Sequence, residues 1–282
     1  LMNYGSAEAR HPLLHRASLD TLICLDQPYH MALRREHMPF FTPSFIADLR
    51  KRVDVKVANL LDIMEAKAKE TGQPLDMVEY FSAELPLFTL CEILGVDVAD
   101  RPKLIQWMHF LEAASQTMRD AETIDPVFFG QFVQNVLDMF EYGKTVLQAR
   151  RKEPRNDLLS AIANAEIDGK PLSDEMLDGS WLLIVFAGND TTRNSLSGTM
   201  KLLSEFPEQK QKLINDPALI PNMAHEAIRM VSPVIYMRRT ATEDAELHGQ
   251  KIAEGEKLVM YYGAANRDPS VFENPDRFDV TR

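Results

Sequence analysis

An acid and an alcohol stand side by side after an apolar stretch of the sequence. Asp190 and Thr191 come shortly after Leu182–Gly188, which reads LLIVFAG. A carboxyl and a hydroxyl group at the edge of a groove can deliver protons to a molecule bound there. Gly188 would let a flat ligand approach the backbone, because glycine has no side chain. The alternative is that a helix simply emerges into solvent at Asn189.

The element that must position this pair is a long helix through the middle of the molecule. Helical periodicity runs from Ser173 to near Glu205, and Trp181–Ala187 is apolar nearly all round, as in a buried helix. Gly188–Thr192 are poor helix formers, and threonine hydroxyls can bond back to the preceding turn. We therefore expect a kink or a bulge in the helix at this segment.

The rest of the chain is predicted to be mainly α-helical, with a small β region near its C-terminal end. Thr42 and Pro43 suit the N-cap and the first turn of a helix that continues to about Lys69. Further helices are expected at residues 76–94, 101–114, 125–151, 208–215 and 220–231. Strand-like residues follow at 240–247 and 257–262, with turns at 248–249 and 254–255. The prediction is a single domain over residues 1–282.

Composition and charge exclude several classes of protein. The 282 residues are 45% hydrophobic and 26% charged, as in folded globular chains. The 42 acidic residues outnumber the 31 basic ones, and no basic run stands out, so no nucleic-acid partner is expected. No apolar stretch approaches the ~20 residues that span a bilayer, so no membrane anchor is seen. Cys24 and Cys91 favour reduced thiols, and the prediction is a monomeric, cytoplasmic protein.

Five motifs follow one another in the order known from one enzyme family. AGNDTT at 187–192 resembles the oxygen-activation motif in the central helix of the cytochrome P-450 haem-thiolate monooxygenases. HMALR at 30–34 looks like the family's HxxxR, and EAIR at 226–229 like its ExxR. PVIYMRRTATEDAEL at 233–247 and ANRDPSVFENPDRFD at 265–279 resemble its strand segment and the stretch before its haem loop. The resemblance covers essentially the whole chain and is to soluble bacterial members.

The resemblance implies a role for each residue of the central helix and of the haem-side core. Asp190 and Thr191 would manage the protons needed at the reacting oxygen, and Ala187 and Gly188 would form the oxygen groove. The family's structural Glu-Arg-Arg network is matched by Glu226, Arg229 and Arg277.

The cofactor implied by the resemblance is haem b. His30, Arg34 and Arg239 match the positions that hold its propionates, and an arginine can bind a carboxylate through two parallel hydrogen bonds. Arg35 and Arg238 are alternatives, because each stands next to a matched arginine.

The family's iron ligand is a cysteine in a Gly- and Phe-rich loop after the PDRF stretch. The sequence ends at Arg282, before any such loop, and Cys24 and Cys91 stand in the wrong order. We interpret both as structural and assign no metal ligand within residues 1–282. The expectation is a partial sequence, truncated at both ends and inactive alone, with the axial cysteine beyond Arg282.

The implied reaction inserts one oxygen atom of O2 into a hydrophobic substrate, with electrons from a ferredoxin and its reductase. An alkane, fatty acid, terpenoid or sterol would suit the apolar positions expected to line the pocket, which are Leu183, Phe186, Val234, Ile235, Tyr236 and Met237. One alternative is a peroxide-using hydroxylase or an isomerase of the same fold, which often lacks the acid–alcohol pair. A second is a haem-free helical binding or regulatory protein.

Overall fold

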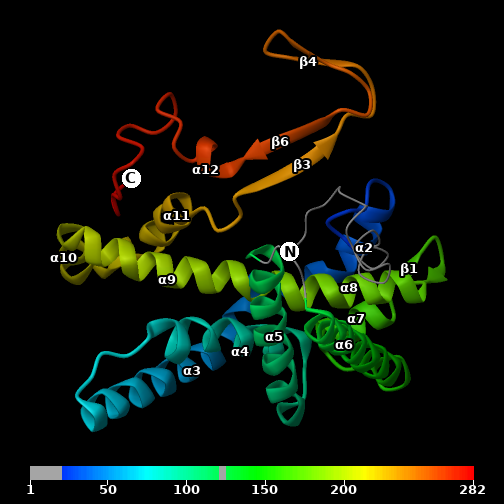
Figure 1. Cartoon of the computed structure of the whole chain (residues 1–282), viewed down its shortest axis with the longest axis horizontal. Helices are drawn as coiled ribbons and strands as arrows, with labels where there is room; N and C mark the ends of the chain where they lie inside the picture. The colour runs from blue at the N-terminus through cyan, green and yellow to red at the C-terminus, as the bar shows by residue number, and fades with distance from the viewer. Residues whose placement is uncertain (1–20, 121–124) are drawn as a thin grey trace. The chain divides into compact units, whose positions relative to one another are not determined.

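The computed structural model describes residues 21–120 and 125–282. Contacts within the chain divide it into two compact units, Leu1–Asn189 and Asp190–Arg282. In the described residues the first unit is helical apart from one short hairpin, and the second combines helices with two small sheets (Figure 1). The predicted class, mainly α with a small β region, is confirmed.

The first unit's helices begin and end largely where local signals predict. Thr42 accepts a hydrogen bond from the backbone N–H of Phe45 at 3.3 Å, as expected of an N-cap. Gly95 closes a helix at φ +74°, a left-handed conformation that favours glycine. These helices are α2 (Tyr29–His37), α3 (Pro43–Thr71), α4 (Glu84–Leu94), α5 (Arg101–Asp120), α6 (Pro126–Lys152), α7 (Leu158–Ala163) and α8 (Asp174–Ala187).

The helix predicted from residue 76 to residue 94 is divided in two. A π-helical turn at Val78–Ser82 precedes α4, and the N–H of Ala83 donates to the carbonyl of Val78 at 2.9 Å. Pro86 stands in the first turn of α4 and has no N–H to donate to the turn before it. A continuous α-helical ladder through this place would therefore be incomplete.

The core of the first unit is built against α8. Trp181 is 1% exposed, and its indole N–H donates to the carbonyl of Met139 on α6 at 3.1 Å. A Cβ built on Gly143 of α6 would lie 2.6 Å from Cδ1 of Trp181. The missing side chain therefore lets α6 approach α8 closely. The hairpin of this unit pairs β1 (Glu166–Ile167) with β2 (Lys170–Pro171).

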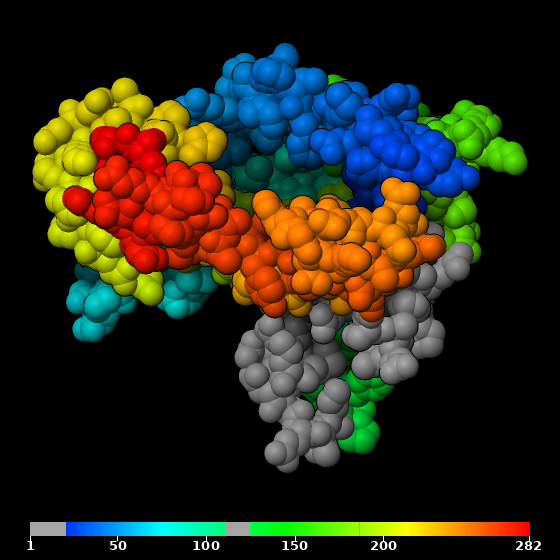
Figure 2. Space-filling model, turned by 90° about the horizontal axis from the view of Figure 1, so that it is seen from above, coloured from blue at the N-terminus to red at the C-terminus, as the bar shows by residue number. Residues whose placement is uncertain are grey.

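The second unit contains α9 (Asp190–Glu205), α10 (Pro207–Asn215), α11 (Ile220–Val231) and the short α12 (Tyr262–Ala265). The C-terminal segment, red in Figure 2, lies against the yellow α10. Here the rings of Phe206 and Phe278 lie 6.0 Å apart, and the N–H of Val280 donates to the side chain of Gln209 at 3.1 Å. Phe278 and Val280 are fully buried, so the segment forms part of this unit's core.

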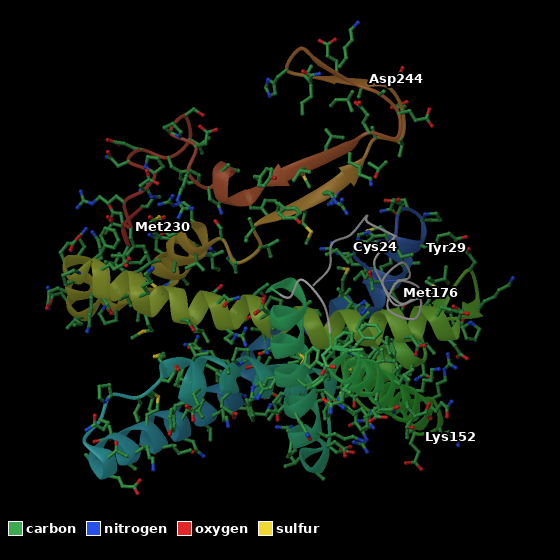
Figure 3. All side chains as sticks on the ribbon, in the orientation of Figure 1. Cys24, Tyr29, Lys152, Met176, Met230 and Asp244 are labelled. Atoms are coloured by element: carbon green, nitrogen blue, oxygen red, sulfur yellow. The ribbon has the colours of Figure 1, made fainter. Side chains whose placement is uncertain are left out.

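The first strand of the β region lies within residues 233–247, which resemble the family's strand segment, but it starts before the strand-like stretch at residues 240–247. Residues 240–247 were expected to be strand-like, whereas β3 spans Tyr236–Thr240 and pairs antiparallel with β6 (Lys257–Tyr261). β4 (Ala245–Leu247) and β5 (Gln250–Ile252) form the second sheet, with the predicted turn at His248 and Gly249 between them. Asp244 lies between β3 and β4 (Figure 3), and its carboxylate accepts from the N–H of Glu254 at 2.9 Å.

Candidate functional site

The long central helix is interrupted where the sequence predicts it. Ser173 caps α8 by accepting from the N–H of Met176 at 3.3 Å, and α8 ends at Ala187. Gly188 and Asn189 form a turn, and α9 starts at Asp190. The break therefore lies inside AGNDTT, and it places Asp190 and Thr191 in the first turn of a new helix.

Asp190 is an exposed carboxylate held by the following turn of its own helix. Its Oδ1 accepts from Nη2 of Arg193 at 2.7 Å and from Nδ2 of Asn194 at 3.1 Å. Thr191 is half-buried, and its backbone carbonyl accepts from the hydroxyl of Ser195 at 2.8 Å. This back-bond comes from Ser195, which lies outside Gly188–Thr192, so back-bonding by the threonine hydroxyls of that segment stays a prediction.

Gly188 has a packing partner in the first unit. A Cβ built on Gly188 would lie 2.6 Å from Cδ1 of Leu90 on α4. Ala187 beside it is exposed. Close packing of α4 therefore explains a glycine at position 188 independently of any ligand, and the oxygen groove stays a prediction.

The three residues expected to hold a cofactor lie in different units. His30 and Arg34 stand four residues apart on α2 of the first unit, so they share one face of that helix. His30 is half-buried and Arg34 is exposed. Arg239 lies on β3 of the second unit, is exposed, and donates from Nη1 to the carbonyl of Arg238 at 2.8 Å.

The residues of EAIR form a buried ion pair on α11. Arg229 donates from Nε to Oε2 of Glu226 at 2.7 Å and from Nη2 to Oε1 at 2.8 Å. Its Nη1 donates to the carbonyls of Asn266 and Pro275, which ties α11 to the C-terminal segment. The network therefore holds an irregular segment in place through backbone oxygens.

The third arginine of this network differs from the one predicted. The sequence analysis expected the side chain of Arg277, but Arg277 contributes its backbone carbonyl, 3.2 Å from Nη2 of Arg229. The second guanidinium on Glu226 is that of Arg282, whose Nε lies 3.1 Å from Oε1. Arg282 stands five residues beyond Arg277 in a segment without helix or strand, so spacing alone could not identify it.

The electrostatics of Glu226 follow from these contacts. Burial raises the pKa of its carboxyl group. Hydrogen bonds from Arg229, from the N–H of Asp279 and from Arg282 lower this pKa by more than burial raises it. The resulting pKa lies below the ordinary value, so Glu226 is ionised at neutral pH.

Met230, the next residue on α11, is labelled in Figure 3, and its sulfur lies 3.1 Å from Nη2 of Arg229.

The predicted pocket residues are distributed over both units. Leu183 on α8 is half-buried, and the side chain of Phe186 lies outside the described part of the structure. Val234 and Met237 are half-buried, whereas Ile235 and Tyr236 are exposed, Ile235 at 67%. An exposed isoleucine and tyrosine next to the ExxR helix leave apolar surface available for contact.

Neither cysteine resembles a metal ligand. Cys91 on α4 is 1% exposed, and burial raises the pKa of its thiol to about 11, so it is neutral at pH 7. Cys24 is half-buried. In residues 21–120 and 125–282, no three His, Cys, Asp or Glu side chains gather as they would around a metal ion.

Within the same ranges, no helix has the length and apolarity to cross a bilayer.

Two contacts of Asp190 went unnoticed in the sequence. Arg193 and Asn194 follow it by three and four residues, and side chains at these spacings meet on one helix face. That spacing was a usable signal once α9 was known to begin at Asp190.

Comparison with known proteins identifies the family. The cytochrome P-450 family model matches residues 14–282. Linalool 8-monooxygenase of Pseudomonas putida is 38% identical over 92% of this chain and 61% of its own length. Methyl-branched lipid omega-hydroxylase of Mycobacterium bovis is 34% identical over 93% of this chain and 60% of its own length.

A solved structure supports the same assignment. The Mycobacterium marinum cytochrome P-450 in complex with pseudoionone matches with a TM-score of 0.83 and 33% identity, over 96% of this chain and 63% of that one. The chain thus spans about three fifths of the length of the curated relatives it matches. The match covers the interrupted helix, the ExxR pair and the C-terminal segment, and the chain belongs to the cytochrome P-450 family.

Proposed function

We propose that the complete protein is a haem-thiolate monooxygenase that inserts one oxygen atom of O2 into a hydrophobic substrate. Membership of the family supports the reaction class. The observation that carries the proposal is the interruption between α8 and α9. It places the adjacent residues Asp190 and Thr191 in the first turn of α9. A carboxylate that is exposed to solvent beside a half-buried hydroxyl suits the uptake and transfer of protons.

The three residues assigned to the propionates of haem b have the chemistry to bind carboxylates. His30 and Arg34 place two polar groups on one face of α2, and Arg239 is an exposed guanidinium. Among the described residues, one of the five N–H groups of Arg239 donates to an acceptor, the carbonyl of Arg238, so others remain for a carboxylate. Haem bound by these residues would supply the activation of O2.

The chain's own residues would hold and move protons. Asp190 takes a proton from solvent at its carboxylate, and Thr191 passes it on through its hydroxyl, which both donates and accepts. Ala187 is exposed and has a small side chain, so it would leave room for a small molecule, whereas Leu90 fills the space at Gly188. This division of roles makes the loss of the hydroxyl and the loss of the carboxyl separately testable.

The substrate class and partners are part of the same proposal. The pocket positions Leu183, Val234, Ile235 and Met237 are apolar, which favours an alkane, fatty acid, terpenoid or sterol. The names of the two bacterial relatives, a linalool monooxygenase and a lipid hydroxylase, support a terpenoid or a lipid. We propose a monomeric, cytoplasmic enzyme that receives electrons from a ferredoxin and its reductase.

The decisive experiment uses the complete protein, loaded with haem. Reduced under carbon monoxide, it should show the red-shifted Soret band of thiolate ligation. With a ferredoxin, its reductase and O2, it should oxidise at least one of octane, hexadecanoic acid, linalool and cholesterol. A protein that binds no haem would support the haem-free alternative. Turnover with peroxide, but none with O2 and the electron donors, would support the peroxide-using alternative.

A variant of Thr191 tests the mechanism. Thr191→Ala should uncouple reductant consumption from product formation, because the hydroxyl that passes the proton is lost. Unchanged coupling in this variant would remove Thr191 from the mechanism.

A further inference from the structure

The two oxygens of the Asp190 carboxylate have different surroundings. Oδ1 accepts from both Arg193 and Asn194, at 2.7 and 3.1 Å. Among the described residues no side chain or backbone group donates to Oδ2 of Asp190. The carboxylate is therefore anchored at one oxygen and open at the other.

This asymmetry determines which oxygen can carry a proton. A guanidinium is a donor only, so the N–H of Arg193 that points at Oδ1 needs a lone pair there. A proton added to Oδ1 would face this N–H and break the charge-assisted bond. Oδ2 is consequently the oxygen that takes up and releases the proton.

Anchoring also limits rotation of the group. The terminal torsion of an aspartate is broad and roughly two-fold, so an unanchored carboxyl group presents either oxygen to its surroundings. Two donors on Oδ1 select one orientation. The side chain of Arg193 is 20% exposed, whereas that of Asp190 is 53% exposed, so a mostly covered cation holds a carboxylate that solvent can reach.

We propose that Arg193, assisted by Asn194, is a positioning residue that makes Oδ2 the single proton-carrying oxygen of Asp190. The inference rests on the proposed role of Asp190 in proton delivery. The competing explanation is local stability, because an acid at a helix N-terminus and an ion pair three residues apart each stabilise a helix slightly. The two explanations differ in what the loss of Arg193 should change.

The test compares Arg193→Gln with Lys201→Met in the complete, haem-loaded protein. Lys201 also lies on α9, and it forms an exposed pair with Glu205 at 3.7 Å, so its variant removes an ion pair from the same helix without touching Asp190. The substrate is the compound turned over fastest among octane, hexadecanoic acid, linalool and cholesterol. Three quantities are measured: the rate of product formation, the hydrogen isotope effect of D2O on that rate, and amide exchange over residues 187–194.

We expect Arg193→Gln to slow product formation about tenfold, less than the roughly hundredfold or more attached to loss of a general acid. The solvent isotope effect should rise, because proton transfer becomes slower relative to the other steps. Amide exchange over residues 187–194 should stay unchanged, and Lys201→Met should behave like the wild type. Arg193→Lys should restore part of the rate, since it keeps the charge but loses the planar fork.

Three results would overturn the proposal. Wild-type rate and isotope effect in Arg193→Gln would show that the anchor is dispensable. A slower rate accompanied by faster amide exchange at residues 187–194 would show that the pair only stabilises the start of α9. Wild-type coupling of reductant consumption to product formation in Asp190→Asn would remove Asp190 from proton delivery, and the role of Arg193 with it. If Asp190→Asn were uncoupled while Arg193→Gln kept the wild-type rate and isotope effect, the anchoring role of Arg193 alone would be refuted.

Discussion

Glu226 and Arg229 form a two-pronged ion pair on one face of α11, with N–O distances of 2.7 and 2.8 Å. The exposed fractions of the two side chains are 3% and 6%, so neither charge is solvated by bulk water. Arg229 also donates to backbone carbonyls of Asn266 and Pro275. The pair therefore links a helix to an irregular segment.

Removal of Arg229 should destabilise the fold strongly. In Arg229→Met, Glu226 stays buried with Arg282 as its remaining cation, and several backbone carbonyls lose their donor. Breaking a buried pair on one side costs about 3–5 kcal/mol. Urea unfolding of the full chain measures this loss.

The matched control is an exposed ion pair. Arg50 and Asp54 on α3 lie 3.8 Å apart with both side chains largely in solvent, so Arg50→Met should cost under about 1 kcal/mol. Equal losses in the two variants would contradict the special position of Arg229.

Local signals were sufficient for most of the helices, although not for the division of the one predicted at residues 76–94. The predicted helix at residues 220–231 coincides with α11. The break in the central helix was also predictable, because Gly188–Thr192 are poor helix formers. These features depend only on residues that are close together in the sequence, so the sequence alone was enough to predict them.

Contacts between distant residues were the part that the sequence could not provide. β3 begins at Tyr236 because Tyr236 pairs with Tyr261, 25 positions away, and no local pattern reports that register. The choice of Arg282 over Arg277 depends on the path of an irregular segment back to Glu226. Both errors concern partners that are set by the course of the chain rather than by residue type.

Gly198 should be intolerant of even one methyl group. A Cβ built on it would lie 2.5 Å from Cγ2 of Val231, where α9 and α11 meet. Gly198→Ala should therefore destabilise the fold by about 1–3 kcal/mol, although alanine favours a helix by about 1 kcal/mol. Thermal unfolding measures the change.

Two further variants make the result for Gly198 specific. Val231→Ala in the Gly198→Ala background should recover part of the loss, because it removes the methyl groups in conflict. Gly130→Ala on α6 should be neutral or stabilising, since no described atom lies within 4 Å of the added Cβ. A stabilising Gly198→Ala would show that α9 and α11 are less closely packed than the structure has them.

His37 should make stability depend on pH below neutrality. Burial lowers the pKa of His37 more than the bond to the carbonyl of Leu33 and the nearby Glu36 raise it. The unfolded chain then binds a proton more readily than the native one, starting near an ordinary pKa of about 6.5. The stabilisation is fully present above about pH 6.5 and is lost as the pH falls from there through the lower, native pKa.

The measurement for His37 is the urea midpoint between pH 5 and pH 8. His37→Gln should flatten this dependence, because glutamine can donate a hydrogen bond but does not titrate. His225→Gln, at an exposed position of α11, should keep the wild-type slope. Parallel slopes in all three proteins would rule out His37 as the source.

Cys91 should resist alkylation in the native protein. Its thiol is 1% exposed, and a pKa of about 11 leaves roughly one thiolate in a thousand at pH 8, the form that reacts. Iodoacetamide at pH 8 should therefore modify the half-buried Cys24 first, and Cys91 only after unfolding in urea. Peptide mass spectrometry distinguishes the two sites. If native Cys91 were alkylated as fast as it is in urea, its thiol would be accessible and ionised, and a structural role for it would no longer hold.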